Sequence, residues 1–209
     1  MTAAFIALAL DAGTTQAVLA RKAALRELSG RQKYLDDPPH ITLYLAEFPD
    51  LQPVATAVAE VAAATVQPQL HFRGWHVFMA DALVGGNTLV CDLEAADRAP
   101  LERIQAEVIQ RLSPMRDRTT TRDALAHAWP SLTPARRLSS ETTGFPFTGD
   151  DWHPHVTIAS IRTDDWARSW AALEPQALRL SGHAPELVLY RLDDDLPCRF
   201  GAWPMRRSS

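Results

Sequence analysis

The chain has 209 residues, a net charge of −4 and an apolar fraction of 46%, which suit one large globular domain or two small lobes around a core. A protein that grips long nucleic acid through its phosphates needs a basic surface, so the negative charge argues against that function. A pocket that binds one nucleotide or one RNA end is still compatible with this net charge. Cys91 and Cys198 lack metal-ligand spacing, and we expect reduced thiols in a cytoplasmic protein.

The apolar N-terminus could be mistaken for a signal peptide. No basic residue precedes the apolar run, however, and Asp11 ends it after a few residues. A buried first strand is therefore the better interpretation. No stretch reaches the ~18 apolar residues of a transmembrane helix. We expect a cytoplasmic protein with no membrane partner and no obligate protein partner.

Strands and helices alternate through the first half of the chain. Apolar residues recur at every second position in the strands and at every third or fourth position in the helices. Gly30 marks the end of the first helix and Pro53 the start of the second, because glycine favours helix C-termini and proline the first helical turn. In chain order, these elements are strand 5–10, helix 14–29, loop 31–39, strand 40–48, the helix from Pro53, strand 70–79 with a bulge or bend at Gly74, and strand 88–94.

The second half begins with a helix near Pro100 and continues into residues 113–150, which we predict to be an irregular, Arg-rich insertion. Such a segment is most often a solvated surface, and a lid that contacts substrate is the alternative. The last elements are a strand through His155, a helix from about Asp164 with Thr163 as its N-cap and Trp166 and Trp170 in the core, and strands 186–192 and 199–204.

Two short strings in opposite halves are near copies of each other. Both have the pattern Pro-His-apolar-Thr-apolar, at residues 39–43 and 154–158. The chain has seven histidines, and only His40 and His155 are followed by Thr two positions later. Residues i and i+2 of a strand point to the same face. Each string therefore places an imidazole beside a hydroxyl, with the apolar residues turned into a core.

Two such pairs in one pocket would supply two acid–base groups and two hydroxyl donors, which suits chemistry on a phosphate. The alternative is that His40 and His155 are ordinary strand-edge residues satisfied by local hydrogen bonds. We favour the first interpretation because the strings are a matched pair. His153 also forms a His-x-His with His155, but no acidic or third histidine ligand lies at useful spacing, so no metal site is predicted and His153 is expected at the rim.

On these two strings the chain resembles the two-histidine (2H) phosphoesterase superfamily, and in particular bacterial 2′-5′ RNA ligase-like proteins. The resemblance implies an α+β fold of two lobes related by a pseudo-twofold axis, each an antiparallel sheet with helices on its outer face. It covers most of residues 1–209 as a single bilobal domain. The active site would lie in a groove between the lobes, where His40 and Thr42 face His155 and Thr157.

The resemblance implies a metal-independent phosphoesterase that hydrolyses 2′,3′-cyclic phosphates of RNA ends or small nucleotides, without a cofactor. His155 would activate water as the base, and His40 would protonate the leaving oxygen. Run in reverse, the same pair would join a cyclic phosphate to a 5′-hydroxyl as a 2′-5′ RNA ligase. The alternative from another class is a non-catalytic module that binds RNA ends or nucleotides.

Substrate-binding residues are less well defined by the sequence. Many relatives carry an arginine three residues after the second Thr, where this chain has Ser160, and Arg162 is the nearest arginine. Aromatic side chains close to the two strings could stack on a base. The candidate substrate-binding residues are Tyr34, Tyr44, Trp152 and Arg162.

Overall fold

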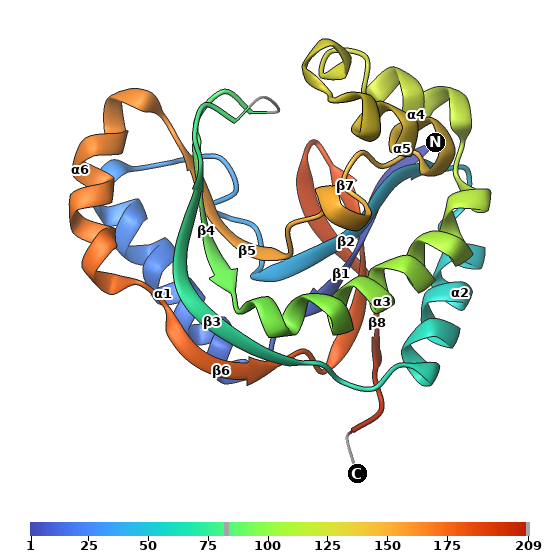
Figure 1. Ribbon diagram of the computed structural model, residues 1–209, viewed down its shortest axis with the longest axis horizontal. Helices are drawn as coiled ribbons and strands as arrows, with labels where there is room; N and C mark the ends of the chain where they lie inside the picture. The colour runs from blue at the N-terminus through green and yellow to red at the C-terminus, as the bar shows by residue number, and fades with distance from the viewer. Residues whose placement is uncertain (82–83, 208–209) are drawn as a thin grey trace.

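Two antiparallel sheets of four strands each form the frame of the protein (Figure 1). The computed structural model describes residues 1–81 and 84–207. The first sheet has the order β2–β1–β7–β8, with strands at His40–Phe48, Thr2–Ala9, Glu186–Asp193 and Leu196–Pro204. The second has the order β5–β4–β3–β6, with strands at His155–Ile161, Asn87–Leu93, Gln69–Phe78 and Arg179–His183.

Helices cover one face of each sheet. Helices α2 and α3 pack on the first sheet, whereas α1 and α6 pack on the second. The other two helices belong to the segment between α3 and β5. The bounds are α1 Ala12–Ser29, α2 Leu51–Ala64, α3 Ala95–Leu112, α4 Arg118–Ala124, α5 Pro134–Thr143 and α6 Thr163–Leu173. Short 3₁₀ turns lie at Ser113–Met115, Trp129–Ser131, Gly149–Asp151 and Glu174–Gln176.

The two lobes predicted from the sequence are present, but each is assembled from both halves of the chain. The order of elements suggested that a His/Thr strand, the next helix and the next two strands form one lobe. Instead, β3 and β4 join the sheet of His155, and β7 and β8 join that of His40. Helix α1 follows β1 in the chain and yet packs against β5 and β6. Figure 1 shows the blue and red ends of the chain sharing one sheet.

The His/Thr strands carry matching irregularities. In β2 the pairing with β1 shifts after Thr42, so that Leu43 is an extra, unpaired residue. In β5 the pairing with β4 shifts after Thr157, and Ile158 is the extra residue. A bulge adds one residue to one strand and changes which face the following side chains occupy. In both strands, therefore, the His and Thr side chains share one face. After the Thr, the bulge interrupts the regular alternation of side chains between the two faces of the sheet.

The faces of each sheet are distinguished by what they contact. In β1, Ile6 and Leu8 belong to the main core under the helices, whereas Phe5 and Ala7 lie on the opposite face. His40 is on this opposite face, because its ring lies 4.9 Å from that of Phe5. We call the face of each sheet that bears His40 or His155 its histidine face. The apolar residues between and after each His and Thr point into the core, as the sequence predicts.

The segment over 113–150 is more regular than predicted, since it contains α4 and α5. Several of its arginines bind the segment's own backbone. Arg116 is buried and donates to the carbonyls of Ser113 and Thr142 near the end of α5. Arg137 donates to the carbonyls of Trp129 and Pro130. These contacts make the arginines structural parts of the segment, and its role toward substrate stays a prediction.

Smaller departures have local causes. Helix α3 begins one turn before Pro100, where the buried carboxylate of Asp97 accepts hydrogen bonds from His71. Strand β6 was not predicted, and the N-cap of α6 is Arg162 instead of Thr163. The irregularity predicted at Gly74 is confirmed by a register shift beside it. Within the described residues, no helix combines the length and apolar character needed to cross a membrane.

Candidate active site

His40 and His155 stand at the first positions of β2 and β5, and these two strands contact each other at the junction of the lobes (Figure 1). The indole Nε1 of Trp152 donates to the carbonyl of Thr42 at 3.2 Å, which ties the segment before β5 to β2. The charge of His155 also acts on His40. The fold thus brings together the two strings that the sequence singled out.

The two imidazoles are held in the same way. Nδ1 of His40 lies 2.6 Å from the carbonyl oxygen of Pro38, and Nδ1 of His155 lies 2.6 Å from that of His153. A carbonyl can only accept, so Nδ1 carries the proton in both rings. Each Nε2 is consequently the acceptor of a neutral ring, or the donor of a charged one. Thr42 Oγ1 lies 3.1 Å from Nε2 of His40 and donates to it when that ring is neutral.

Aromatic side chains surround His40. Its ring lies 4.9 Å from Phe5 and 5.9 Å from Tyr190, and those two rings stack on each other at 4.9 Å. Burial is the main cause that lowers the pKa of His40 to about 4, and the charges of Lys22 and His155 add to it. The hydrogen bond to Pro38 acts in the opposite direction. The ring of His40 is therefore neutral in the free protein at neutral pH.

His155 has more polar neighbours. Its ring lies 5.2 Å from Phe78 and 5.9 Å from His153. Burial again lowers its pKa to about 4, with His153 and His76 acting in the same direction and Asp92 raising the pKa. Both histidine side chains are only partly buried, so solvent at the exposed ring edges limits these shifts.

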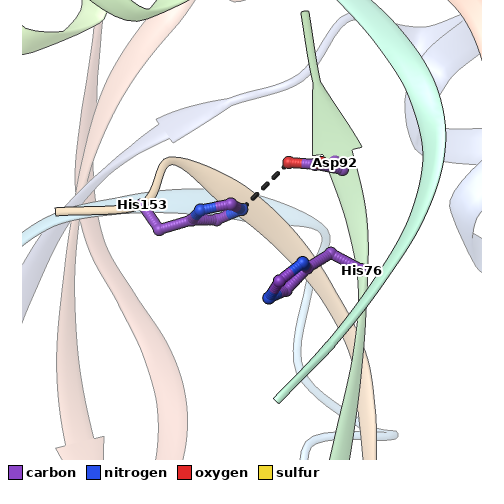
Figure 2. Close-up of side chains that lie close together, drawn as sticks. All are labelled: His76, Asp92 and His153. Atoms are coloured by element: carbon purple, nitrogen blue, oxygen red, sulfur yellow. Dashed lines mark hydrogen bonds and ion pairs between the residues drawn. The ribbon is translucent and has the colours of Figure 1, made fainter. Parts of the chain in front are cut away.

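A second cluster lies beside His155 and consists of His76, Asp92 and His153 (Figure 2). Nε2 of His153 bonds to Oδ1 of the buried Asp92 at 2.9 Å. Arg73 binds the other oxygen of Asp92 through Nε at 2.8 Å and Nη2 at 2.6 Å. This arrangement was not predicted from the sequence, because the three residues come from separate parts of the chain. The sequence contains one indication of it, because Asp92 is the single charged residue of β4.

The cluster has the residue types of a metal site, and its ligand atoms lie within 4.8 Å of one another. Its geometry fits a metal poorly for two reasons. Both oxygens of Asp92 already accept hydrogen bonds, from Arg73 on one side and from His153 and the Leu93 amide on the other. The rings of His76 and His153 stack at 4.7 Å and 30°, whereas ligating nitrogens point at a common centre.

Lys22 anchors the loop that leads to His40. It is buried, and its Nζ donates to the carbonyls of Tyr34 at 2.7 Å and Asp37 at 2.9 Å. Tyr34 has a φ of +67°, a strained conformation for a residue with a side chain. The lysine thus fixes the loop next to Pro38, whose carbonyl orients His40. Lys22 occupies the buried stripe of α1 with Val18 and Leu25, so helical periodicity could have identified it.

The structure corrects the prediction for Tyr44. Tyr44 is fully buried, and its hydroxyl donates to the carbonyl of Thr143. The bulge at Leu43 turns Tyr44 onto the helix-covered face, away from His40 and Thr42. Tyr44 is therefore a core residue and not available to stack on a base.

The other substrate-binding candidates differ in what they contact. Trp152 is 4% exposed and donates a hydrogen bond to the backbone of β2. It therefore connects the two lobes and presents little surface to a ligand. Arg162 pairs with Asp165 and lines a pocket of about 370 Å³ with Ser160 and Lys33, at the opposite end of β5 from His155. The structure thus separates Arg162 from the histidines. Tyr34 is half-buried, burial raises its pKa to about 12, and its role stays a prediction.

Comparisons with known proteins agree with the fold. The sequence model of the 2′-5′ RNA ligase superfamily matches residues 15–196. The structure resembles TT0787 of Thermus thermophilus with a TM-score of 0.60 and 16% identity, over 99% of this chain and 100% of that one. It also resembles E. coli LigT complexed with 3′-AMP, with a TM-score of 0.52 and 16% identity over 98% of both chains. None of the curated protein sequences matches the chain significantly.

Two antiparallel lobes that each present a His-x-Thr pair on neighbouring strands match the class of two-histidine phosphoesterases. The chain belongs to the 2′-5′ RNA ligase superfamily. The resemblance inferred from the two strings is thereby confirmed. Membership supports a phosphoesterase- or ligase-type activity.

Proposed function

We propose that the protein hydrolyses 2′,3′-cyclic phosphates, on RNA ends or on nucleotides, with His40 and His155 as its acid–base pair. The observation that carries this proposal is the matched Nδ1 hydrogen bond of the two rings, which directs both Nε2 atoms away from the backbone. A pair of imidazoles so arranged can accept one proton and deliver another across a single phosphate.

Opening the ring requires three events. Nε2 of one neutral imidazole takes a proton from water as the water oxygen bonds to phosphorus. Nε2 of the other, charged imidazole gives its proton to the 2′- or 3′-oxygen as the P–O bond breaks. The hydroxyls of Thr42 and Thr157 would donate to the non-bridging oxygens, where negative charge grows. We retain the prediction, from the family resemblance, that His155 is the base and His40 the acid.

The same site would run in reverse when a 5′-hydroxyl replaces water, forming a 2′-5′ linkage without ATP. The predicted step uses only proton transfers and hydrogen bonds by residues of this chain. Structures of LigT have been solved with 3′-AMP, ATP and NADP⁺, which supports a nucleotide or an RNA end as the ligand class here. We assign RNA termini and cyclic nucleotides as the substrates and partners of the protein.

The test is a panel of 2′,3′-cyclic nucleotides and short RNAs with a cyclic terminus, analysed for monoester products and for 2′- or 3′-regiochemistry. We expect turnover with one regioisomer in excess. The rival is a non-catalytic module that binds the same groups. Binding of the whole panel without turnover would establish the module and overturn the enzyme.

A further inference from the structure

His76 is a third histidine on the histidine face of the second sheet. It pairs across β3 and β4 with Val90, which in turn pairs with Thr157. Residues directly opposite each other in a sheet share a face. His76 is half-buried, and within the described residues neither of its ring nitrogens has a hydrogen-bond partner. A basic side chain with free nitrogens therefore lies on the same face as Thr157, two strands away.

Further basic groups adjoin His76. Its ring stacks on that of His153 at 4.7 Å, and Arg73 lies close enough for its charge to act on His76. Arg73 binds Asp92 through Nε and Nη2, and its side chain is 49% exposed. Nη1 of Arg73 therefore has no partner in the described part of the chain. Figure 2 shows the two imidazoles together next to the carboxylate.

The negative charge of this cluster is already paired, so it does not repel an anion. Among the described residues, Asp92 is the acidic group that raises the pKa of His76, and it forms an ion pair with Arg73. Burial, His153 and Arg73 all lower the pKa of His76, which favours a neutral ring in the protein alone. An anion would reverse that balance by pairing with protonated imidazoles and with the free face of the guanidinium.

Resting on the proposed function, we propose that Arg73, His76 and His153 bind a second phosphate group of the substrate, next to the phosphate that reacts between His40 and His155. The cluster adjoins the site, since the rings of His153 and His155 lie 5.9 Å apart. Guanidinium and imidazolium groups are the donors that recognise phosphate oxygens in proteins. The proposal names the substrate class as a cyclic phosphate that carries another phosphate close by.

Two sources could supply the second phosphate. One is the phosphodiester that precedes the terminal nucleotide of an RNA, and the other is a 5′-phosphate on a single cyclic nucleotide. The experiment therefore compares three substrates: adenosine 2′,3′-cyclic phosphate, the same nucleotide with a 5′-phosphate, and a dinucleotide with a 2′,3′-cyclic terminus. We expect the wild-type protein to prefer one or both of the two-phosphate substrates in kcat/KM.

The variant is His76→Asn, which keeps a polar side chain but cannot become charged. We expect it to reduce the preference for the two-phosphate substrate about tenfold, mainly through KM, as the loss of one charge-assisted hydrogen bond implies. The matched control is His71→Asn on the same strand, because His71 bonds to Asp97 in the first turn of α3 and not to a member of the cluster. The control should keep the wild-type preference.

The proposal is overturned if the wild-type protein shows no preference for a second phosphate, or if His76→Asn keeps it. It is also overturned if calorimetry finds a Zn²⁺ site that His76→Asn removes, since the cluster would then be a metal site. Failure of the proposed function has a different signature, namely no turnover of any substrate. In that case, calorimetry with the corresponding 3′-phosphate products tests the second-phosphate site alone, and equal affinities in wild type and His76→Asn overturn it.

Discussion

His40 and His155 donate the same hydrogen bond, from Nδ1 to the backbone carbonyl two residues earlier, at 2.6 Å in both lobes. The bond fixes the tautomer and the plane of each ring, so both present Nε2 as the reactive nitrogen. The two lobes differ in the side chains that fix the segment carrying each carbonyl. On the first lobe, Lys22 fixes the loop around Pro38, and on the second, Asp92 and Arg73 hold the side chain of His153.

Stability should fall as the pH drops from 6.5 toward 4. The pKa of both histidines is lowered to about 4 in the folded protein, so between these values the unfolded chain binds more protons than the folded one. Each histidine should cost on the order of 2 kcal/mol at the low end of this window. Urea denaturation of wild type, His40→Gln and His155→Gln at pH 7 and pH 4.5 measures the effect.

The wild-type protein should lose more stability between these pH values than either variant. His127→Gln is the control, because His127 is an exposed histidine outside the candidate site. An equal loss in all four proteins would contradict the lowered pKa of His40 and His155.

Lys22→Met should impair both stability and turnover. The change leaves the carbonyls of Tyr34 and Asp37 without their donor, at a cost of about 1–3 kcal/mol. We expect kcat to fall about tenfold because the carbonyl that orients His40 is no longer held. Thermal unfolding and steady-state kinetics measure the two effects.

Arg26→Met is the matched control for Lys22→Met. Arg26 lies one turn further along α1 and reaches the same loop through an exposed ion pair with Asp36. Exposed pairs contribute about 0–1 kcal/mol, so this variant should stay near wild type. A similar loss in both variants would mean that general loop contacts, and not Lys22, position His40.

Asp92→Asn should reduce turnover through His155. The variant removes the buried charge that holds Arg73 and His153, which should cost roughly 3 kcal/mol. Loss of the anion should also lower the pKa of His155 further, since Asp92 raises it. We therefore expect the limb of the pH–rate profile that belongs to His155 to move to lower pH.

Asp97→Asn tests whether this effect is specific. Asp97 is as buried as Asp92 and also binds a histidine, His71, which does not contact the cluster of Arg73, His76 and His153 in the described part of the chain. The Asp97→Asn variant should be less stable than the wild-type protein and keep the wild-type pH–rate profile. If both aspartate variants shift the profile equally, Asp92 has no particular role at the site.

Chelation should leave the activity unchanged. The proposed step needs no metal, and the oxygens of Asp92 are already occupied by hydrogen-bond donors. Dialysis against EDTA followed by assay without added metal should give the wild-type rate. Loss of activity that Zn²⁺ or Mn²⁺ restores would contradict the proposed chemistry.

The His/Thr strands could be predicted from the sequence because strand alternation is local. His40–Phe48 matches the predicted strand, and the pairing of imidazole with hydroxyl follows from the period of two. Tyr44 shows the limit of that argument. A bulge depends on the partner strand, so the sequence of β2 alone does not reveal that Leu43 shifts the register.

Pairing between distant strands was also not predictable. The local sequences of β3 and β7 do not indicate which sheet each strand joins. The contacts that determine the pairing involve residues far apart in the sequence. For the same reason, His76 and Asp92 had no visible partners before the fold was known. Each became a candidate functional residue only when the sheet placed it beside His155.

The central claim is that His40 and His155 act together on one phosphate. It is tested most directly by the kcat for a 2′,3′-cyclic nucleotide in His40→Ala, His155→Ala and the double variant, with folding confirmed by circular dichroism. We predict that each single variant loses about 10²–10⁴ in rate and that the double variant loses little more, because the two groups serve one step. A folded single variant with near wild-type kcat would contradict the account.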